Sequence, residues 1–174
     1  MSRTPPQIFV AIGANLPSAR FGAPPASFAA ALELLGAEDV EVRRVSRWYR
    51  SPPLPLPPSP QPYYINGVIE VRSQRAPAPL LSLLHQVEKA FGRVRGERNA
   101  ARCLDLDLLA YGDAVITGGE GGLEVPHPRL SGRSFVLMPW ADLAPSWRHP
   151  VSGLTVEEMI ARLPAGQEIE VLEQ

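Results

Sequence analysis

The sequence of 174 residues contains a single cysteine, Cys103, and no long apolar run. With one thiol the chain cannot form an internal disulfide, and a structural zinc site that uses several thiolates is excluded. No stretch approaches the ~20 consecutive apolar residues that are needed to cross a bilayer. The first residues lack the apolar segment of a signal peptide. We therefore expect a cytoplasmic protein with no membrane partner.

An excess of charge of either sign is also missing. The chain has 17 basic residues against 18 acidic residues, a formal net charge of −1 and a pI near 6.3. This balance argues against nucleic acid or an anionic membrane surface as the main partner. Arginines are concentrated at positions 93, 95, 98 and 102. Such a local cluster fits a small anionic ligand better than a polymer.

Proline, in contrast, is abundant, with 20 residues in the chain and seven of them between Ser51 and Pro62. One interpretation of this segment is a polyproline II linker, or a ligand for an aromatic-lined groove. The other is a stiff loop within one domain, next to a site. Strand-like sequence lies on both sides, which favours the loop.

Four apolar segments that are rich in β-forming residues predict strands at residues 7–13, 40–49, 64–72 and 103–111. Two segments with helical spacing lie between them. Ser27 is expected to cap the first helix, which runs to about Leu35 before Gly36. Pro79 opens the second helix and Gly92 closes it.

The predicted order is therefore β-α-β-β-α-β, which indicates an α+β, ferredoxin-like fold with two helices packed on an antiparallel sheet. A C-terminal extension follows, with a glycine-rich turn at 118–122, a short apolar segment at 135–140, a capping box of Thr155 and Glu158 that opens a helix to about residue 163, and a final strand at 168–172. No repeat or interdomain linker is present, so residues 1–174 are expected to form a single domain.

Two acids in the last of the four predicted strands, Asp105 and Asp107, alternate with leucines. Side chains alternate between the faces of a strand, so both carboxylates share one face while the leucines enter the core. The two acids are about 7 Å apart along the backbone and can converge on hard cations. Like charges held this close need a cation, a shared proton or arginines to compensate them.

The arginine cluster and a histidine between two prolines, His127, complete a pattern that is typical of phosphate binding. Arginine offers a planar fork to phosphate oxygens, and Mg²⁺ commonly uses one or two carboxylates together with substrate phosphates. A salt-bridge network on a solvated face is the alternative for acids beside arginines. No Gly-x-x-x-x-Gly-Lys-Ser/Thr motif is present, so a P-loop enzyme is excluded.

Seven motifs spread over nearly the whole chain occur in a characteristic order. They are Ala-Ile-Gly-Ala-Asn-Leu (11–16), Trp-Tyr-Arg-Ser-Pro-Pro (48–53), Tyr-Tyr-Ile-Asn-Gly-Val (63–68), Glu88 with Gly-Arg-Val-Arg (92–95), Arg-Cys-Leu-Asp-Leu-Asp-Leu-Leu (102–109), Pro-His-Pro-Arg (126–129) and Arg-Ser-Phe-Val-Leu-Met-Pro (133–139). In these motifs and their order the sequence resembles the 6-hydroxymethyl-7,8-dihydropterin pyrophosphokinases of folate biosynthesis. The resemblance implies transfer of pyrophosphate from ATP to the pterin hydroxymethyl group, with release of AMP.

The resemblance also implies roles for particular residues at the ATP site. Asp105 and Asp107 would hold two Mg²⁺ ions and, with Arg93 and Arg102, form the catalytic set. The pterin hydroxyl would attack the β-phosphorus. The ATP-binding residues would be Glu88, Arg93, Arg95, Arg98, Arg102, His127 and Arg133.

The pterin would be recognised by edge hydrogen bonds and aromatic stacking. The implied residues are Ser51, Pro52, Pro53, Leu54, Tyr64, Asn66 and Phe135. Taken alone, Phe135 favours a core position, because Val-Leu-Met follows it. The sequence departs from the family at Asn99-Ala100-Ala101, where many members have an aromatic-Gly-Pro. A small-molecule enzyme that acts as a monomer is expected.

Two other hypotheses remain at this point. One is a non-catalytic ligand- or RNA-binding module on a ferredoxin-like scaffold, since a fold alone does not fix a function. The lack of an aromatic-rich RNA-binding strand and the near-neutral charge argue against RNA. The other is an inactive relative that is kept for assembly, against which the intact Asp105 and Asp107 argue.

Overall fold

An antiparallel sheet forms the centre of the protein. The computed structural model describes residues 5–53, 61–93, 101–118 and 120–173. In chain order the elements are β1 (Ile8–Ala14), α1 (Pro24–Ala37), β2 (Glu41–Val45), β3 (Tyr49–Ser51), β4 (Tyr64–Arg72), α2 (Pro77–Ala90), β5 (Asp105–Tyr111), the 3₁₀ turns η1 (Glu120–Gly122) and η2 (Leu130–Gly132), α3 (Ser134–Leu143), α4 (Val156–Ile160) and β6 (Glu170–Val171).

The sheet has the order β5-β1-β4-β3-β6, with β2 also paired to β4, and all of these pairs are antiparallel. The predicted β-α-β-β-α-β order and α+β fold are confirmed. The single strand expected at 40–49 is two strands. Val45 lies opposite Ile69 and Tyr49 lies opposite Asn66. Four residues of this segment therefore span three residues of β4, which leaves one extra residue between the two pairings. An extra residue of this kind interrupts the hydrogen-bond ladder and bends the strand.

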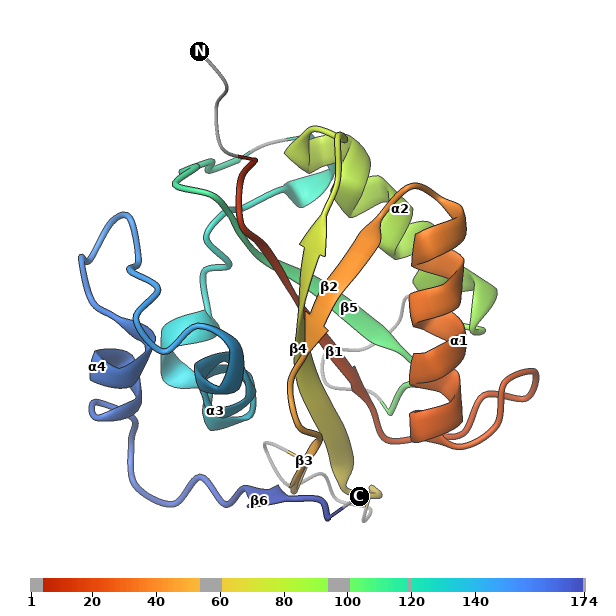
Figure 1. The fold of residues 1–174 in the computed structure, drawn as a ribbon. Helices are drawn as coiled ribbons and strands as arrows, with labels where there is room; N and C mark the ends of the chain where they lie inside the picture. The colour runs from red at the N-terminus through yellow and green to blue at the C-terminus, as the bar shows by residue number, and fades with distance from the viewer. Residues whose placement is uncertain (1–4, 54–60, 94–100, 119, 174) are drawn as a thin grey trace.

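Helices cover both faces of the sheet, α1 and α2 on one side and α3 on the other, with α4 packed against the outer side of α3 (Figure 1). The central strand β1 is apolar along most of its length because it is buried on both faces. Ile8 and Val10 pack under α1 and α2, whereas Phe9 packs under α3.

Prolines set the starts of α1 and α2. Helix α1 begins at Pro24, not near Ser27, and the prediction that Ser27 caps it is wrong: its buried hydroxyl donates to Gly22 O at 2.9 Å inside the helix. Helix α2 begins at Pro77, two residues before the predicted Pro79. Proline suits a first turn because its fixed φ is helical and its missing N–H has no helical partner there.

The ends of the two helices differ. Gly92, with φ of +87°, follows α2 as predicted. In α1, Gly36 lies inside the helix, and the left-handed residue is Asp39, with φ of +59°. The N–H of Val40 then donates to Leu35 O at 3.0 Å.

The apolar segment at 135–140 belongs to a helix, α3, that the sequence analysis did not assign. Its apolar residues lack a clear helical spacing, and Pro139 lies inside it. Packing decides the structure here. The ring of Trp140 lies 5.1 Å from that of Phe9 and 4.5 Å from that of Trp147, centroid to centroid. Helix α3 is thereby attached to the face of the sheet opposite α1 and α2.

The C-terminal elements are shorter than predicted. The capping box of Thr155 and Glu158 is confirmed, but α4 ends at Ile160. The final strand is the two-residue β6, which pairs with β3.

Strand β5 begins at Asp105 rather than at residue 103. Among the described residues, no helix combines the length and apolar character of a membrane span.

Replacing Thr155 by alanine tests the cap of α4. The hydroxyl accepts the N–H of Glu158, and the Glu158 carboxylate accepts the N–H of Thr155. We expect Thr155→Ala to lower the free energy of unfolding by about 1 kcal/mol, measured by urea denaturation. Thr155→Ser retains the acceptor and should stay close to the native value. Equal losses in both variants would contradict the role of the hydroxyl.

Candidate active site

One row of residues crosses the sheet on the face that α3 covers. Asp105 lies opposite Gly13, Gly13 opposite Asn66, and Asn66 opposite Tyr49. Residues directly opposite in antiparallel strands point to the same face. With neighbouring strands about 4.8 Å apart, the backbones of Asp105 and Asn66 are about 10 Å from one another. We call these four residues the central row.

Strand β5 presents its acids on this face, as the alternation predicted. Leu104, Leu106 and Leu108 are buried in the core beneath α1 and α2. Asp105 and Asp107 are partly exposed on the opposite face. A one-residue slip of β5 would expose the leucines and bury both carboxylates, so the core fixes where the acids lie.

The two carboxylates are electrostatically coupled. Burial and then the charge of Asp105 raise the pKa of Asp107, while Arg133, Arg93 and Arg102 oppose the rise, and the net value is about 6. Asp107 is therefore mainly ionised at neutral pH, and a positive charge beside it is favourable. Oxygen donors in this state are suited to a hard divalent cation.

Two arginines bind Asp105 from either side. Arg93 Nη1 lies 2.7 Å from Asp105 Oδ1, and Arg102 Nη1 lies 2.9 Å from Oδ2. These are charge-assisted hydrogen bonds, which are shorter and stronger than neutral ones. The two guanidinium groups are thus already gathered at the acid pair.

Glu88, at the end of α2, connects this helix to the acids. Its side chain is only 3% exposed, accepts the N–H of Leu106 at 2.7 Å and pairs with Arg93. Leu106 lies between the two aspartates. Burial raises the pKa of Glu88 to about 7, while the bond from Leu106 and the charge of Arg93 act in the opposite direction. Glu88 therefore fixes both the strand and one arginine, and its predicted contact with ATP stays a prediction.

His127 approaches Asp107 from the segment after β5. The backbone N–H of His127 donates to Leu109 O at 2.9 Å, and the ring Nδ1 accepts the backbone N–H of Arg129 at 3.2 Å. Burial, followed by the charges of Arg133 and Arg129, lowers the pKa of His127 to about 4. The ring is therefore neutral at pH 7. Since Nδ1 is an acceptor, Nε2 carries the hydrogen, and it lies 3.9 Å from Asp107 Oδ2.

Asn66 lies on the other side of Gly13 from Asp105, and the absence of a side chain on Gly13 leaves space for the Asn66 amide. The Asn66 amide is buried, and its Nδ2 donates to Ser51 Oγ at 2.9 Å. A Cβ atom on Gly13 would come within 2.9 Å of Asn66 Oδ1. Glycine at this position is therefore what allows the amide to lie where it does.

Two aromatic residues, Tyr64 and Phe135, belong to the predicted pterin site. Tyr64 lies opposite Ser51. Burial raises the pKa of Tyr64. The charge of Arg102 acts to lower this pKa, and the charge of Asp105 acts to raise it. Phe135 is half-buried in the first turn of α3, with the guanidinium of Arg133 5.5 Å from its ring centroid. Burial lowers the pKa of Arg133.

Most of the predicted site residues are therefore gathered around one face of the sheet. Ser51 and Pro53 are buried and Pro52 is half-buried at the end of β3. Leu54, Arg95 and Arg98 lie outside the described residues, as do residues 99 and 100.

Asn15 was missed as a site residue by the sequence analysis. It is buried at the end of β1, where its Oδ1 accepts the N–H of Arg102 at 2.9 Å. Its Nδ2 donates to Pro62 O and to Gln61 Oε1, both at 3.2 Å. Asn15 thus connects the segment before β4 with the segment before β5. A polar residue directly after an apolar strand was the available signal.

The sequence matches known proteins over most of its length. The family described as 7,8-dihydro-6-hydroxymethylpterin-pyrophosphokinase (HPPK) matches residues 9–145. A 2-amino-4-hydroxy-6-hydroxymethyldihydropteridine pyrophosphokinase from Synechocystis is 42% identical over 131 residues, which cover 75% of this chain and 65% of that protein. The Pseudomonas aeruginosa protein with the same name is 37% identical over 159 residues, 91% of this chain and 92% of that protein.

A solved structure supports the fold. The crystal structure of wild-type HPPK-DHPS from Plasmodium falciparum superposes with a TM-score of 0.64 at 11% identity. The match covers 92% of this chain and 45% of that longer chain. Sequence and fold therefore agree, and this chain belongs to the 7,8-dihydro-6-hydroxymethylpterin-pyrophosphokinase family.

Proposed function

We propose that the chain transfers pyrophosphate from ATP to the hydroxymethyl group of 6-hydroxymethyl-7,8-dihydropterin, in folate biosynthesis. The products are the pterin diphosphate and AMP. Family membership supports this reaction. The observation that supports the reaction most directly is the central row, because an acid pair and a buried amide lie there on one face of the sheet. A nucleotide and a flat heterocycle can then meet over Gly13.

The arginines are assigned to the phosphates of ATP. Arg93 and Arg102 pair with Asp105 in the structure, and a polyphosphate offers them a larger negative charge at the same place. When they turn to the phosphates, Asp105 is released for a cation. Arg133 supplies a third guanidinium close to Asp107. Arg95 and Arg98 are assigned to the same task from the sequence.

The donors at the acid pair fit Mg²⁺. Both are carboxylate oxygens, and within the described parts of the chain no group of three or more histidine, cysteine or acidic side chains is gathered as a complete metal site. A site with two protein carboxylates, completed by waters and phosphates, is what Mg²⁺ commonly uses. We assign two ions to Asp105 and Asp107. Held by these two carboxylates together with ATP, the ions would offset phosphate charge and polarise the phosphorus.

The pterin is assigned to the Asn66 end of the central row. The Asn66 amide reads the polar edge of the ring, beside Ser51, Pro52 and Pro53, and Leu54 is assigned here from the sequence. Tyr64 and Phe135 provide aromatic surfaces for the ring faces. This orientation directs the hydroxymethyl group across Gly13 towards the β-phosphorus.

Catalysis in this proposal is mainly positioning and charge stabilisation. Neutral His127 offers the hydrogen on Nε2 to a phosphate oxygen, beside Asp107. Glu88 contributes by fixing Arg93 and the backbone of Leu106. The monomeric state and the cytoplasmic location stay predictions.

The reaction is tested by its nucleotide product. The protein is incubated with Mg²⁺, ATP and the hydroxymethyl dihydropterin, and the nucleotides are separated. We expect AMP in a one-to-one ratio with the pterin diphosphate, and no turnover once a chelator removes the metal. ADP as the product would identify an ordinary kinase, and the absence of any product would favour a binding role.

Removing either carboxylate should abolish turnover. We expect Asp105→Ala and Asp107→Ala each to lower kcat/KM on the order of 10³-fold or more, because several kcal/mol of charge stabilisation is lost with the metal. Circular dichroism should report an intact fold. Asp113→Ala, an exposed acid just after the same strand, is the control and should remain active. A near-normal rate in either site variant would rule out the metal assignment.

The space at Gly13 should matter for the pterin and not for ATP. Gly13→Ala forces the Asn66 amide to move, so we expect the Kd for the pterin to rise about tenfold, the value of one hydrogen bond. Asn66→Ala should act in the same direction. Calorimetry with each ligand separates the two effects. Gly36→Ala is the matched control, because its Cβ meets nothing within 4 Å. A defect confined to ATP binding would contradict the assignment.

A further inference from the structure

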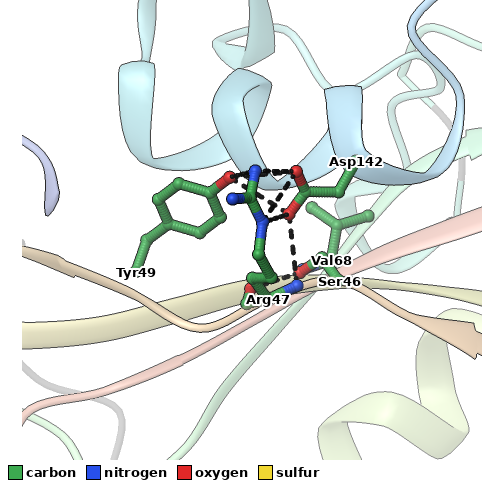
Figure 2. A network of polar contacts seen from close by, with 5 residues as sticks. All are labelled: Ser46, Arg47, Tyr49, Val68 and Asp142. Atoms are coloured by element: carbon green, nitrogen blue, oxygen red, sulfur yellow. Dashed lines mark hydrogen bonds and ion pairs between the residues drawn. The ribbon is translucent and has the colours of Figure 1, made fainter. Parts of the chain in front are cut away.

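A partly buried hydrogen-bond network joins β3 to α3, away from the acid pair. Figure 2 shows Tyr49, Arg47 and Asp142 converging between the sheet and the helix. The hydroxyl of Tyr49 lies 3.1 and 3.0 Å from the two carboxylate oxygens of Asp142. Arg47 Nη2 donates to the Tyr49 hydroxyl at 2.9 Å and to Asp142 Oδ1 at 2.5 Å. The backbone N–H of Arg47 donates to Asp142 Oδ2 at 3.2 Å.

The hydroxyl of Tyr49 depends on this carboxylate. The tyrosine is 2% exposed, and the side chain of Asp142 is 16% exposed. Burial raises the pKa of Tyr49, and its bond to Asp142 raises it further, so the hydroxyl keeps the proton that it donates. Arg47, at 59% exposure, closes the network on the solvent side. A buried hydroxyl without a partner would be costly.

The network joins the two sides of the proposed pterin pocket. On one side, Tyr49 is two residues before Ser51, the last residue of β3, which Pro52 and Pro53 follow. On the other side, Asp142 is near the end of α3, and Phe135 is in its first turn. The helix contacts both β3 and β4.

Strand β3 has little else to fix it against α3. It has three residues, and its outer neighbour β6 has two, both exposed. Trp140 attaches the helix to Phe9 in β1, not to β3. Short peripheral strands are held weakly by their own ladder. Among the described residues, the bonds of Tyr49 to Asp142 link β3 to α3, and a bond from Arg44 Nη1 to Leu143 O at 2.7 Å links the neighbouring β2 to the end of the same helix.

We propose that Tyr49 and Asp142 are positioning residues that set the width of the pterin pocket and thereby the affinity for the pterin, without touching it. This inference rests on the proposed function. Loss of the link lets β3, with Ser51, move away from Phe135. Helix α3 stays attached to β1 through Trp140 and Phe9, so Arg133 and the acid pair on β5 keep their places. The effect is consequently specific for one of the two substrates.

Steady-state kinetics of Tyr49→Phe, Asp142→Ala and the double variant test the proposal. We expect each single variant to raise the KM for the pterin five- to tenfold, with kcat and the KM for ATP within twofold of the native values. The double variant should raise the KM for the pterin no further than the larger single effect, because both changes break one link. Arg47→Ala changes only an exposed arm of the network and should raise the same KM two- to threefold.

Thr155→Ala is the control for stability. It removes a helix cap in α4, which packs on α3, and leaves the network intact. At a comparable loss of stability its KM for the pterin should stay within twofold. An unchanged KM for the pterin in the network variants, or equal losses in kcat and in the KM for ATP, would overturn the inference while the proposed function stands. A native protein that makes no AMP would overturn the proposed function itself, and this inference with it.

Discussion

The alternation of leucine and aspartate along β5 is the constraint on which the rest of the site depends. Burial of Leu104, Leu106 and Leu108 beneath α1 and α2 holds the strand in one register. Each buried leucine contributes about 1.5–3 kcal/mol, so a slip that exposed all three would cost about 4.5–9 kcal/mol, a large part of the stability of a typical domain. Asp105 and Asp107 are therefore kept together on the open face although they repel one another.

Compensation of this repulsion organises the surroundings. Arg93 and Arg102 bind Asp105, and Glu88 holds Arg93 from the end of α2. The same groups that neutralise the acids in the structure are those that a polyphosphate and a divalent cation would redistribute. The charged groups of the site are held by one another and would gain phosphate and cation partners on binding, which is consistent with a catalyst that acts mainly by preorganised charge.

Local features of the structure could be predicted from the sequence, but the pairings between strands could not. The bounds of β4, the faces of β5 and the capping box of α4 follow from periods and caps that involve neighbouring residues. The central row does not, because it joins Asp105, Gly13 and Asn66 through strand pairings that no local pattern specifies. Helix α3 was missed because packing on Phe9 overrides a proline and an irregular apolar pattern. The burial of Glu88 and the bonds of Asn15 likewise depend on chain segments that are distant in sequence.

We propose that the metal site and the pterin pocket share one face of the sheet, separated by the single strand β1 with Gly13. The most direct measurement replaces Mg²⁺ by paramagnetic Mn²⁺, with a non-hydrolysable ATP analogue and the pterin bound, and records the proton spectrum of the pterin. The account predicts strong broadening of the hydroxymethyl protons with Mn²⁺, none with Mg²⁺, and loss of the effect in Asp107→Ala. Sharp hydroxymethyl signals from a pterin that is bound beside Mn²⁺ would contradict it.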